Sequence, residues 1–161
     1  MKISVLMGGS SAEREVSIKT GRAVIKACQE LGHKVVPVDF YDDYKSTLGI
    51  LKKADIVFNA LHGTVGEDGT IQLWLEDNNI SFTGSDSDSS KLCMNKYKSK
   101  KTVRESNFLT PDWFLIDSEN QLTQIDFPCI VKPNSQGSTF GLSMIENKDG
   151  IKDAIKLAFK Y

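Results

Sequence analysis

Blocks of hydrophobic and polar positions follow one another along the first part of the chain, and their period changes from block to block. Lys2–Met7 is a short apolar run that ends at two glycines, which is typical of a buried strand. Ser10 and Glu13 have the spacing of a capping box, so we expect a helix to start there. Seven residues then recur at helical spacing, and Gly32 is placed to end the helix; they are Val16, Thr20, Ala23, Val24, Ala27, Cys28 and Leu31.

Strand and helix patterns keep alternating as far as residue 83. The pattern predicts helices at 44–53 and 70–78 and strands at 34–38, 56–61 and 80–83. Pro37 cannot donate a ladder hydrogen bond, which favours a position near the sheet edge for its strand. Alternation with short connections predicts a parallel sheet covered on both faces, and hence a Rossmann-like α/β domain over residues 1–88.

The pattern changes after the polar segment 85–90. Residues 94–106 form a basic helical pattern, three short strands are expected near 113–116, 129–132 and 142–146, and an amphipathic helix is expected at 148–160. Strands that follow one another without intervening helices indicate an antiparallel α+β unit. We therefore expect a second, different domain over residues 89–161.

Composition narrows the class of protein. The 161 residues are 40% hydrophobic and 25% charged, as in ordinary soluble globular domains. Lys plus Arg (20) nearly balance Asp plus Glu (21), so neither nucleic acid nor an anionic membrane is an expected partner. No apolar stretch is long enough to span a bilayer. The three cysteines are odd in number and far apart, which argues against a disulfide framework or a zinc site and favours the cytoplasm.

Two glycine-containing loops follow predicted strands in the first domain. After Gly8 and Gly9 a helix start offers free N–H groups to an anion, and Glu15, one turn further, could bind an ammonium group. The spacing is not that of a dinucleotide-binding loop. The alternative is a tight turn, with Glu15 only favouring the helix N-terminus. The second loop, 62–69 with Gln72 after it, gathers His62, three glycines and two acids where ligands bind in open α/β folds, unless the histidine is structural.

Lysines mark the second domain. Lys132 ends a predicted strand and precedes a loop of glycines and hydroxyl residues at 137–141, so it could reach nucleotide phosphates while the loop folds over them. This loop is not a Walker A sequence. The alternative is a hairpin connection with an exposed lysine. On the basic helix, Lys96 is a second candidate, whereas Lys98, Lys100 and Lys101 are interpreted as a solvated face.

Four segments in this order resemble the D-alanine–D-alanine ligase family of the ATP-grasp superfamily, in register from residue 3 to about residue 145. They are GGSSAEREVSIKTG, HGTVGEDGTIQ, FTGSDSDSSKLCMNKYKSK and PCIVKPNSQGSTFG. The resemblance implies a Rossmann-like N-terminal domain followed by an incomplete α+β small subdomain of the ATP-grasp fold. Asn95 stands where the family usually has aspartate, and Thr139 where a second serine is common.

The resemblance also implies roles for single residues. Glu15 matches the glutamate near the ammonium of the first D-alanine, and His62 matches a histidine near the same substrate. Ser138 matches a serine that hydrogen-bonds to Glu15 and orients substrate, so these two residues carry the implied catalytic role. Lys96 and Lys132 match lysines that contact ATP phosphates, with Gly137, Ser138 and Thr139 in the phosphate-binding loop.

The implied reaction joins two D-alanines at the expense of ATP, with Mg2+, for peptidoglycan synthesis and cell shape. A first carboxylate attacks the γ-phosphate, and the amine of a second D-alanine displaces phosphate from the acyl phosphate. Such a transfer needs positioning and charge neutralisation more than covalent help. The implied parent enzyme is a cytoplasmic homodimer.

The family's magnesium ligands and second-substrate site follow the matched region, so we expect this chain to be an N-terminal fragment that is inactive alone. Three alternatives stay open. The parent could be a depsipeptide or D-alanine–D-serine ligase. The chain could instead be a stand-alone, non-catalytic module that binds D-alanine or nucleotide. Finally, it could be a Rossmann-like domain whose glycine loops are only structural.

Overall fold

The computed structural model describes residues 1–118 and 125–161, which form two compact units. Unit 1 is Met1–Lys91 and unit 2 is Leu92–Tyr161, so the division falls close to the boundary expected after residue 88. In the part of the chain described, no helix is long and apolar enough to cross a membrane.

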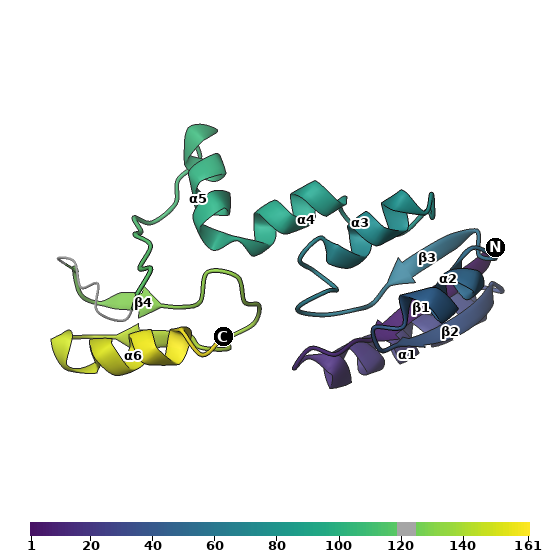
Figure 1. Ribbon diagram of the computed structural model, residues 1–161, viewed down its shortest axis with the longest axis horizontal. Coiled ribbons are helices and arrows are strands. Elements are labelled where there is room, and N and C mark those ends of the chain that lie inside the picture. Colours follow the sequence, from purple (N-terminus) through teal and green to yellow (C-terminus); the bar gives the residue numbers. More distant parts are fainter. Residues whose placement is uncertain (119–124) are drawn as a thin grey trace. The chain divides into compact units, whose positions relative to one another are not determined.

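Unit 1 is built on a parallel sheet with the strand order β2-β1-β3 (Figure 1). The strands are β1 (Lys2–Gly8), β2 (Lys34–Phe40) and β3 (Ile56–Asn59). Pro37 lies in the edge strand β2, as its missing N–H group predicts. The expected strand at 80–83 is wrong, because this segment makes only one isolated parallel bridge, from Phe82 to Val57.

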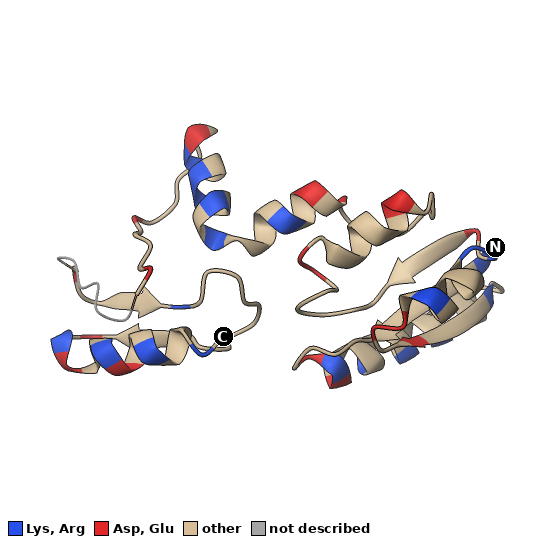
Figure 2. Cartoon of the chain, in the orientation of Figure 1, with Lys and Arg blue, Asp and Glu red and all other residues tan. Residues whose placement is uncertain are grey.

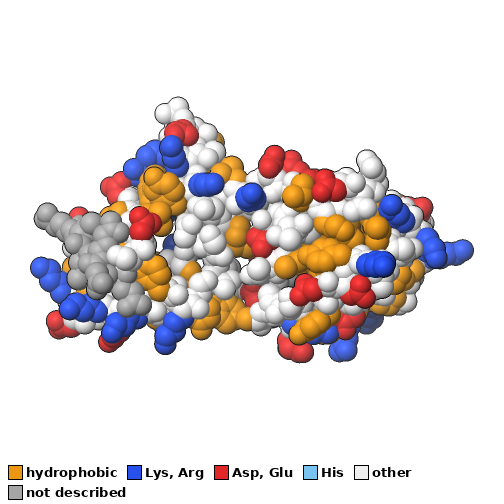
Figure 3. All heavy atoms as spheres, viewed as in Figure 1, with side chains coloured by type: hydrophobic (Ala, Val, Ile, Leu, Met, Phe, Trp, Pro, Cys, Tyr) orange, Lys and Arg blue, Asp and Glu red, His pale blue; other side chains and the backbone are white. Residues whose placement is uncertain are grey.

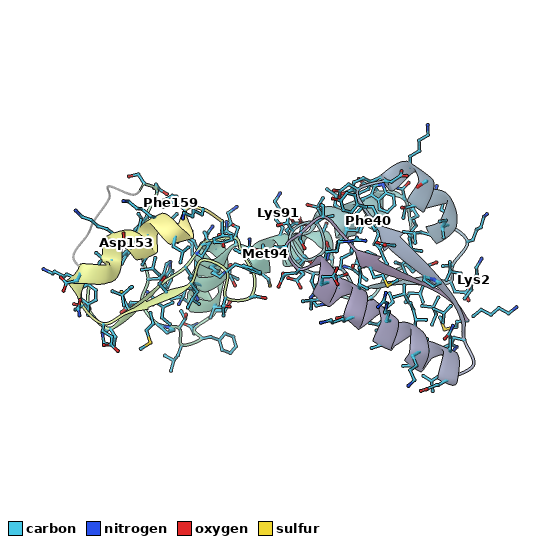
Figure 4. All side chains as sticks on the ribbon, turned by 90° about the horizontal axis from the view of Figure 1, so that it is seen from below. Lys2, Phe40, Lys91, Met94, Asp153 and Phe159 are labelled. Carbon is cyan, nitrogen blue, oxygen red and sulfur yellow. The ribbon has the colours of Figure 1, made fainter. Side chains whose placement is uncertain are left out.

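Helices cover both faces of this sheet, as the alternating pattern predicts. On one face α1 (Arg14–Glu30) packs its apolar side chains against Ile3 and Val5 of the central strand. On the other face α2 (Tyr44–Leu51) and α3 (Thr70–Asp77) enclose Leu6 and Phe40. Phe40 has no exposed surface and lies among the side chains of this core in Figure 4. Neighbouring residues of β1 thus serve opposite faces, as a strand buried on both sides requires.

The two ends of α1 show what local sequence can and cannot predict. The helix starts at Arg14, and the capping box expected at Ser10 and Glu13 is wrong. The hydroxyl of Ser11 accepts the Glu13 N–H and donates to the carbonyl of His62, so these residues form a turn against the loop that begins there. At the other end Gly32 has a φ of +79°, and its N–H donates to Gln29, as a glycine C-cap predicts.

Unit 2 is an α+β arrangement around one antiparallel hairpin. Its helices are α5 (Lys96–Glu105) and α6 (Ile151–Ala158), preceded by the short 3-10 helix η1 (Lys148–Gly150), and its strands are β4 (Cys129–Val131) and β5 (Ser143–Ile145). Helix α4 (Ser87–Met94) runs from one unit into the other. Ile145, Ile151 and Ile155 form the small core between the hairpin and α6, which Asp153 and Phe159 mark in Figure 4.

The basic helix expected at 94–106 is confirmed as α5, which starts two residues later because the Asn95 side chain accepts the Lys98 N–H and caps the helix. One expectation for unit 2 is wrong. The strand expected near 113–116 does not form in the described structure, where those residues lie outside any strand. Lys and Arg are concentrated on α5 (Figure 2).

Candidate functional site

The glycine turn after β1 is fixed by hydrogen bonds to α1 and β2. Both glycines have positive φ, +99° at Gly8 and +83° at Gly9, which glycine adopts without strain. The Gly8 N–H donates to the buried Ser17 hydroxyl (2.8 Å), which itself donates to the carbonyl of Ala60 (2.7 Å). The Gly9 N–H donates to the carbonyl of Phe40 at 2.8 Å. The turn therefore has one defined shape at the carboxyl edge of the sheet.

Arg14 adds a charged support to this turn and leaves Glu15 exposed. Its guanidinium forms an ion pair with Asp39 (2.8 Å) and also donates to the carbonyl of Gly9 (3.3 Å). The hydrogen bond to Asp39 raises the pKa of Arg14, so the guanidinium stays charged. The neighbouring Glu15 lies exposed in the first turn of α1, where a carboxylate also favours the helix dipole.

His62 is held through both ring nitrogens. Its Nε2 lies 3.1 Å from the Thr20 hydroxyl on α1, and its Nδ1 lies 3.2 Å from the Glu67 carboxylate. An ionised carboxylate can only accept a hydrogen bond, so Nδ1–H donates to Glu67, and in the neutral ring Nε2 then accepts a hydrogen bond from the Thr20 hydroxyl. The His62 side chain keeps 32% of its surface exposed, so it is oriented and still accessible. The structure thus places His62 against the same helix that carries Glu15.

The loop that carries His62 and Glu67 is fixed around Gly66. The Gly66 carbonyl accepts one hydrogen bond from the Asn59 amide (3.0 Å) and one from the buried Gln72 amide (2.8 Å). A Cβ atom at Gly66 would lie 2.7 Å from the carbonyl carbon of Leu61, so only glycine fits there. Gln72, singled out from the sequence, therefore supports the loop from beneath.

Val65 in this loop has a strained backbone. Its φ is +72°, a conformation that β-branched residues rarely adopt and that costs about 1–3 kcal/mol. The Asp68 carboxylate accepts the Val65 N–H at 2.9 Å and the Thr70 N–H at 3.0 Å, which holds the turn and starts α3. One of the two acids in the loop is thus structural, which a sequence pattern does not distinguish.

In unit 2 the structure brings the candidate lysines together. Lys96 opens α5, and its Nζ donates to the carbonyl of Gln136 in the loop after β4. Burial and, next, the positive charge of Lys132 lower the pKa of Lys96. The Lys96 N–H also donates to the carbonyl of Asn134 at 2.9 Å, so the start of α5 contacts the segment that follows Lys132, although the two lysines are far apart in the sequence.

Lys100 belongs to the same positive group, and its interpretation as part of a solvated face is wrong. Its Nζ donates to the Thr110 hydroxyl (2.7 Å) and to the carbonyl of Pro111 (2.9 Å), and it lies 5.2 Å from the centre of the Trp113 ring. Burial, then Lys132 and Arg104, lower its pKa. The one available signal was that Lys96 and Lys100 are four residues apart, on the same face of a helix.

The loop of glycines and hydroxyl residues lies between β4 and β5 as predicted. The Gly137 N–H donates to the side chain of Gln136 (3.0 Å), and Ser138 is exposed with a φ of +51°. The carbonyl of Thr139 accepts the Leu142 N–H at 3.2 Å. The expected hydrogen bond between Ser138 and Glu15 joins the two units and stays a prediction.

Next to the lysines, the outer face of the hairpin is apolar. Ile130 and Met144 lie opposite each other in the register, 60% and 67% exposed. Lys132 is two residues beyond Ile130, so the strand alternation places it toward the same face. Figure 3 shows that hydrophobic side chains reach the surface of both units in the view drawn. Among residues 1–118 and 125–161, no group of three or more His, Cys, Asp or Glu side chains is arranged to hold a metal ion.

Comparison with known proteins identifies this combination of elements. Residues 42–85 match the family model for the D-ala D-ala ligase N-terminus, and residues 101–161 match the model for the D-ala D-ala ligase C-terminus. The chain belongs to the D-alanine–D-alanine ligase family. The D-alanine–D-alanine ligase of Clostridium botulinum (strain Loch Maree) is 40% identical over 166 residues, which cover 100% of this chain and 55% of that protein. The enzyme of Aquifex aeolicus is 43% identical over 156 residues, 95% of this chain and 53% of that protein.

Solved ligase structures agree with the fold. The D-alanine–D-alanine ligase of Bacillus anthracis is similar with a TM-score of 0.89 and 36% identity, over 99% of this chain and 54% of that one. The structure of that enzyme complexed with ATP gives a TM-score of 0.86 and 34% identity, over 100% of this chain and 56% of that one. The chain therefore spans about half the length of the ligases it matches, and the predicted fold class and family are confirmed.

Proposed function

We propose that this chain supplies the first-substrate domain and part of the ATP site of a D-alanine–D-alanine ligase. The observation that carries the proposal is the convergence of Lys96 and Lys132 beside the loop 137–141. The similar ligase of Bacillus anthracis has been solved in complex with ATP, which supports the choice of anion.

The electrostatics of unit 2 favour a polyphosphate. Like charges that are partly buried repel one another, and a bound anion would remove that cost and give charge-assisted hydrogen bonds. Burial and, after it, the positive charge of Lys132 lower the pKa of Lys96, and a bound polyphosphate would offset both effects. The exposed apolar pair Ile130 and Met144 offers a flat surface on which a nucleotide base could rest beside the phosphates.

Unit 1 would hold the first D-alanine. Glu15 would pair with its ammonium group, and His62, already oriented by Thr20 and Glu67, would lie near the same substrate. Ser138 from the phosphate-binding loop would hydrogen-bond to Glu15, so that substrate and nucleotide are bound together. Gly137 and Thr139 would contribute to the ATP side.

In the reaction we propose, a carboxylate oxygen of D-alanine attacks the γ-phosphorus and the bond to the β-phosphate oxygen breaks, which releases ADP. The amine of a second D-alanine then attacks the acyl phosphate, loses a proton and expels phosphate, giving D-alanyl-D-alanine. Magnesium would neutralise phosphate charge, and we assign its ligands to the part of the family's length that this chain does not span. The parent enzyme would be a homodimer in the cytoplasm, and its dipeptide product would serve peptidoglycan synthesis.

An assay of the native gene's product tests this proposal. With D-alanine, ATP and magnesium, we expect D-alanyl-D-alanine and phosphate in equal amounts, whereas the 161-residue chain alone should form no dipeptide. Lys132→Met should raise the KM for ATP about ten- to a hundredfold, since it removes a charge-assisted contact. Lys148→Met, on the exposed end of η1, is the matched control and should change nothing. Absence of dipeptide with the native product would contradict the proposal.

A further inference from the structure

The phosphate-binding loop is fastened at its base to the first turn of α5. The backbone carbonyl of Asn134 accepts the Lys96 N–H at 2.9 Å, and the Asn134 side-chain oxygen accepts the Tyr97 N–H at 2.9 Å. The Nζ of Lys96 donates to the carbonyl of Gln136 two residues further on. Three hydrogen bonds therefore connect residues 134–136 to Lys96 and Tyr97.

Asn134 completes a helix cap that α5 cannot make from neighbouring sequence alone. The first N–H groups of a helix have no partner inside the helix. Asn95, the residue before the helix, accepts only from Lys98 through its side chain. Asn134, 37 positions beyond Tyr97, accepts the N–H groups of Lys96 and Tyr97. Its position is therefore set by the helix terminus and not by the hairpin alone.

The same residue controls the spacing of the two phosphate lysines. Lys96 is the first residue of α5, and Lys132 is two residues before Asn134 in the chain. The bond from the Lys96 N–H to the Asn134 carbonyl (2.9 Å) therefore joins the start of α5 to the segment that follows Lys132. The second bond, from the Tyr97 N–H to the Asn134 side chain (2.9 Å), fixes the same two segments to each other.

We propose that Asn134 is a positioning residue of the ATP site, which holds Lys96 and Lys132 at the spacing that a triphosphate requires. The inference rests on the proposed function, because ATP is the anion concerned. Asn134 acts through the lysines and the loop and takes no part in the chemistry. Its removal should therefore weaken nucleotide binding and leave D-alanine binding and the chemical step nearly unchanged.

The structure offers a matched control for this idea. Asn147, in the same unit, caps η1 in the same manner, because its side chain accepts the Asp149 N–H at 3.0 Å. Asn134→Ala and Asn147→Ala each remove one side-chain cap, so a purely structural role predicts similar changes in melting temperature and in kinetics for both. A positioning role predicts that only Asn134→Ala affects ATP.

The experiment is steady-state kinetics of the native gene's product with each variant. We expect Asn134→Ala to raise the KM for ATP about five- to tenfold, with kcat and the KM for D-alanine within twofold of the unmodified enzyme. Asn147→Ala should leave all three constants unchanged. Equal KM values for ATP in Asn134→Ala and the unmodified enzyme would overturn the inference, as would an equal rise in Asn147→Ala.

Asn134→Asp keeps the test decisive if the alanine variant does not fold. The carboxylate keeps the acceptor for the Tyr97 N–H, so the melting temperature should be retained, yet its negative charge beside Lys96 should oppose the phosphates and raise the KM for ATP. An unchanged KM for ATP in Asn134→Asp would contradict a position near the phosphates. If the unmodified enzyme forms no dipeptide, the proposed function fails; if it does and the variants behave like it, only the inference about Asn134 fails.

Discussion

The two loops that carry the candidate site are stabilised in opposite ways. In unit 1 each polar group of the loop 62–69 described above has a neutral or oppositely charged partner, as His62 has in Thr20 and Glu67. In unit 2 the loop after Lys132 lies among like charges, and burial and neighbouring cations lower the pKa values of Lys96 and Lys100. The first loop is electrostatically complete as folded, whereas we propose that a bound anion completes the second.

The hydrophobic core beside the loop is also more extensive in unit 1 than in unit 2. Unit 1 has a sheet with buried side chains on both faces, whereas unit 2 has one hairpin with one helix against it. A bound ligand raises the stability of the state that binds it. We therefore expect nucleotide to stabilise unit 2 and to leave unit 1 nearly unchanged.

The largest expected effect is the loss of a core side chain in unit 1. Phe40→Ala removes a ring with no exposed surface and should lower the free energy of unfolding by about 3–5 kcal/mol. Urea denaturation followed by regional hydrogen exchange measures the loss in each unit. Phe159→Ala, a change at a half-exposed side chain of unit 2, is the control. If Phe40→Ala lowered the free energy of unfolding no more than Phe159→Ala does, Phe40 would not be part of the core of unit 1.

A smaller effect is expected at the glycine beneath His62. Gly66→Ala brings a Cβ atom within 2.7 Å of the carbonyl carbon of Leu61 and should cost about 1–3 kcal/mol. Gly49→Ala is the matched change in α2, where a Cβ meets nothing within 4 Å, and it should be neutral or stabilising. Thermal unfolding of both variants provides the measurement, and equal melting temperatures would show that the loop is not fixed around Gly66.

Local sequence predicted the parts of the fold that depend on neighbouring residues. Pro37 at the sheet edge and Gly32 at the end of α1 follow from their own backbone chemistry, and both predictions are confirmed. The predicted start of α1 is wrong because Ser11 is held by the carbonyl of His62, a partner 51 positions away. The segment around Phe82 forms only a bridge to Val57, and the chain bends at Thr83 and Gly84 directly after it.

The candidate site likewise has a part that could be predicted from sequence and a part that could not. The loops and the pairing of Lys96 with Lys132 could be predicted from motifs and their resemblance to the ligase family. The supports of those residues could not, because Thr20 meets His62 across 42 positions and Asn134 meets Tyr97 across 37. Hydrogen bonds of that span depend on the tertiary fold and leave no periodic signal.

The hydroxyl that holds His62 sharpens the comparison further. Thr20→Val keeps the shape of the side chain and removes its bond to Nε2, so it should cost about 1 kcal/mol. Thr102→Val, at an exposed position of α5, should change the free energy of unfolding much less. Chemical denaturation of the two variants measures the difference. An equal cost in both would indicate that the His62 ring does not depend on Thr20.

The smallest expected effect is a pH dependence in unit 2. Because the pKa of Lys96 is lowered from 10.5, the unfolded chain binds its proton more tightly than the folded chain does. Between the folded pKa and 10.5, the free energy of unfolding should therefore rise with pH, and below that window the cost of the charge is fully present. Lys100 should contribute in the same direction. Between pH 8 and pH 10, the free energy of unfolding should rise less in Lys96→Met than in the unmodified protein. An identical rise would contradict a contribution from the partly buried charge of Lys96.

Hydrogen exchange with and without ATP and magnesium distinguishes a phosphate site in unit 2 from one in unit 1. We expect slower exchange in residues 94–105 and 129–141, with β1, β2 and β3 unchanged. Lys132→Met should remove this protection, and Lys148→Met should retain it. Protection confined to the sheet of unit 1, or none in either unit, would contradict the assignment of the phosphate site to the lysines of unit 2.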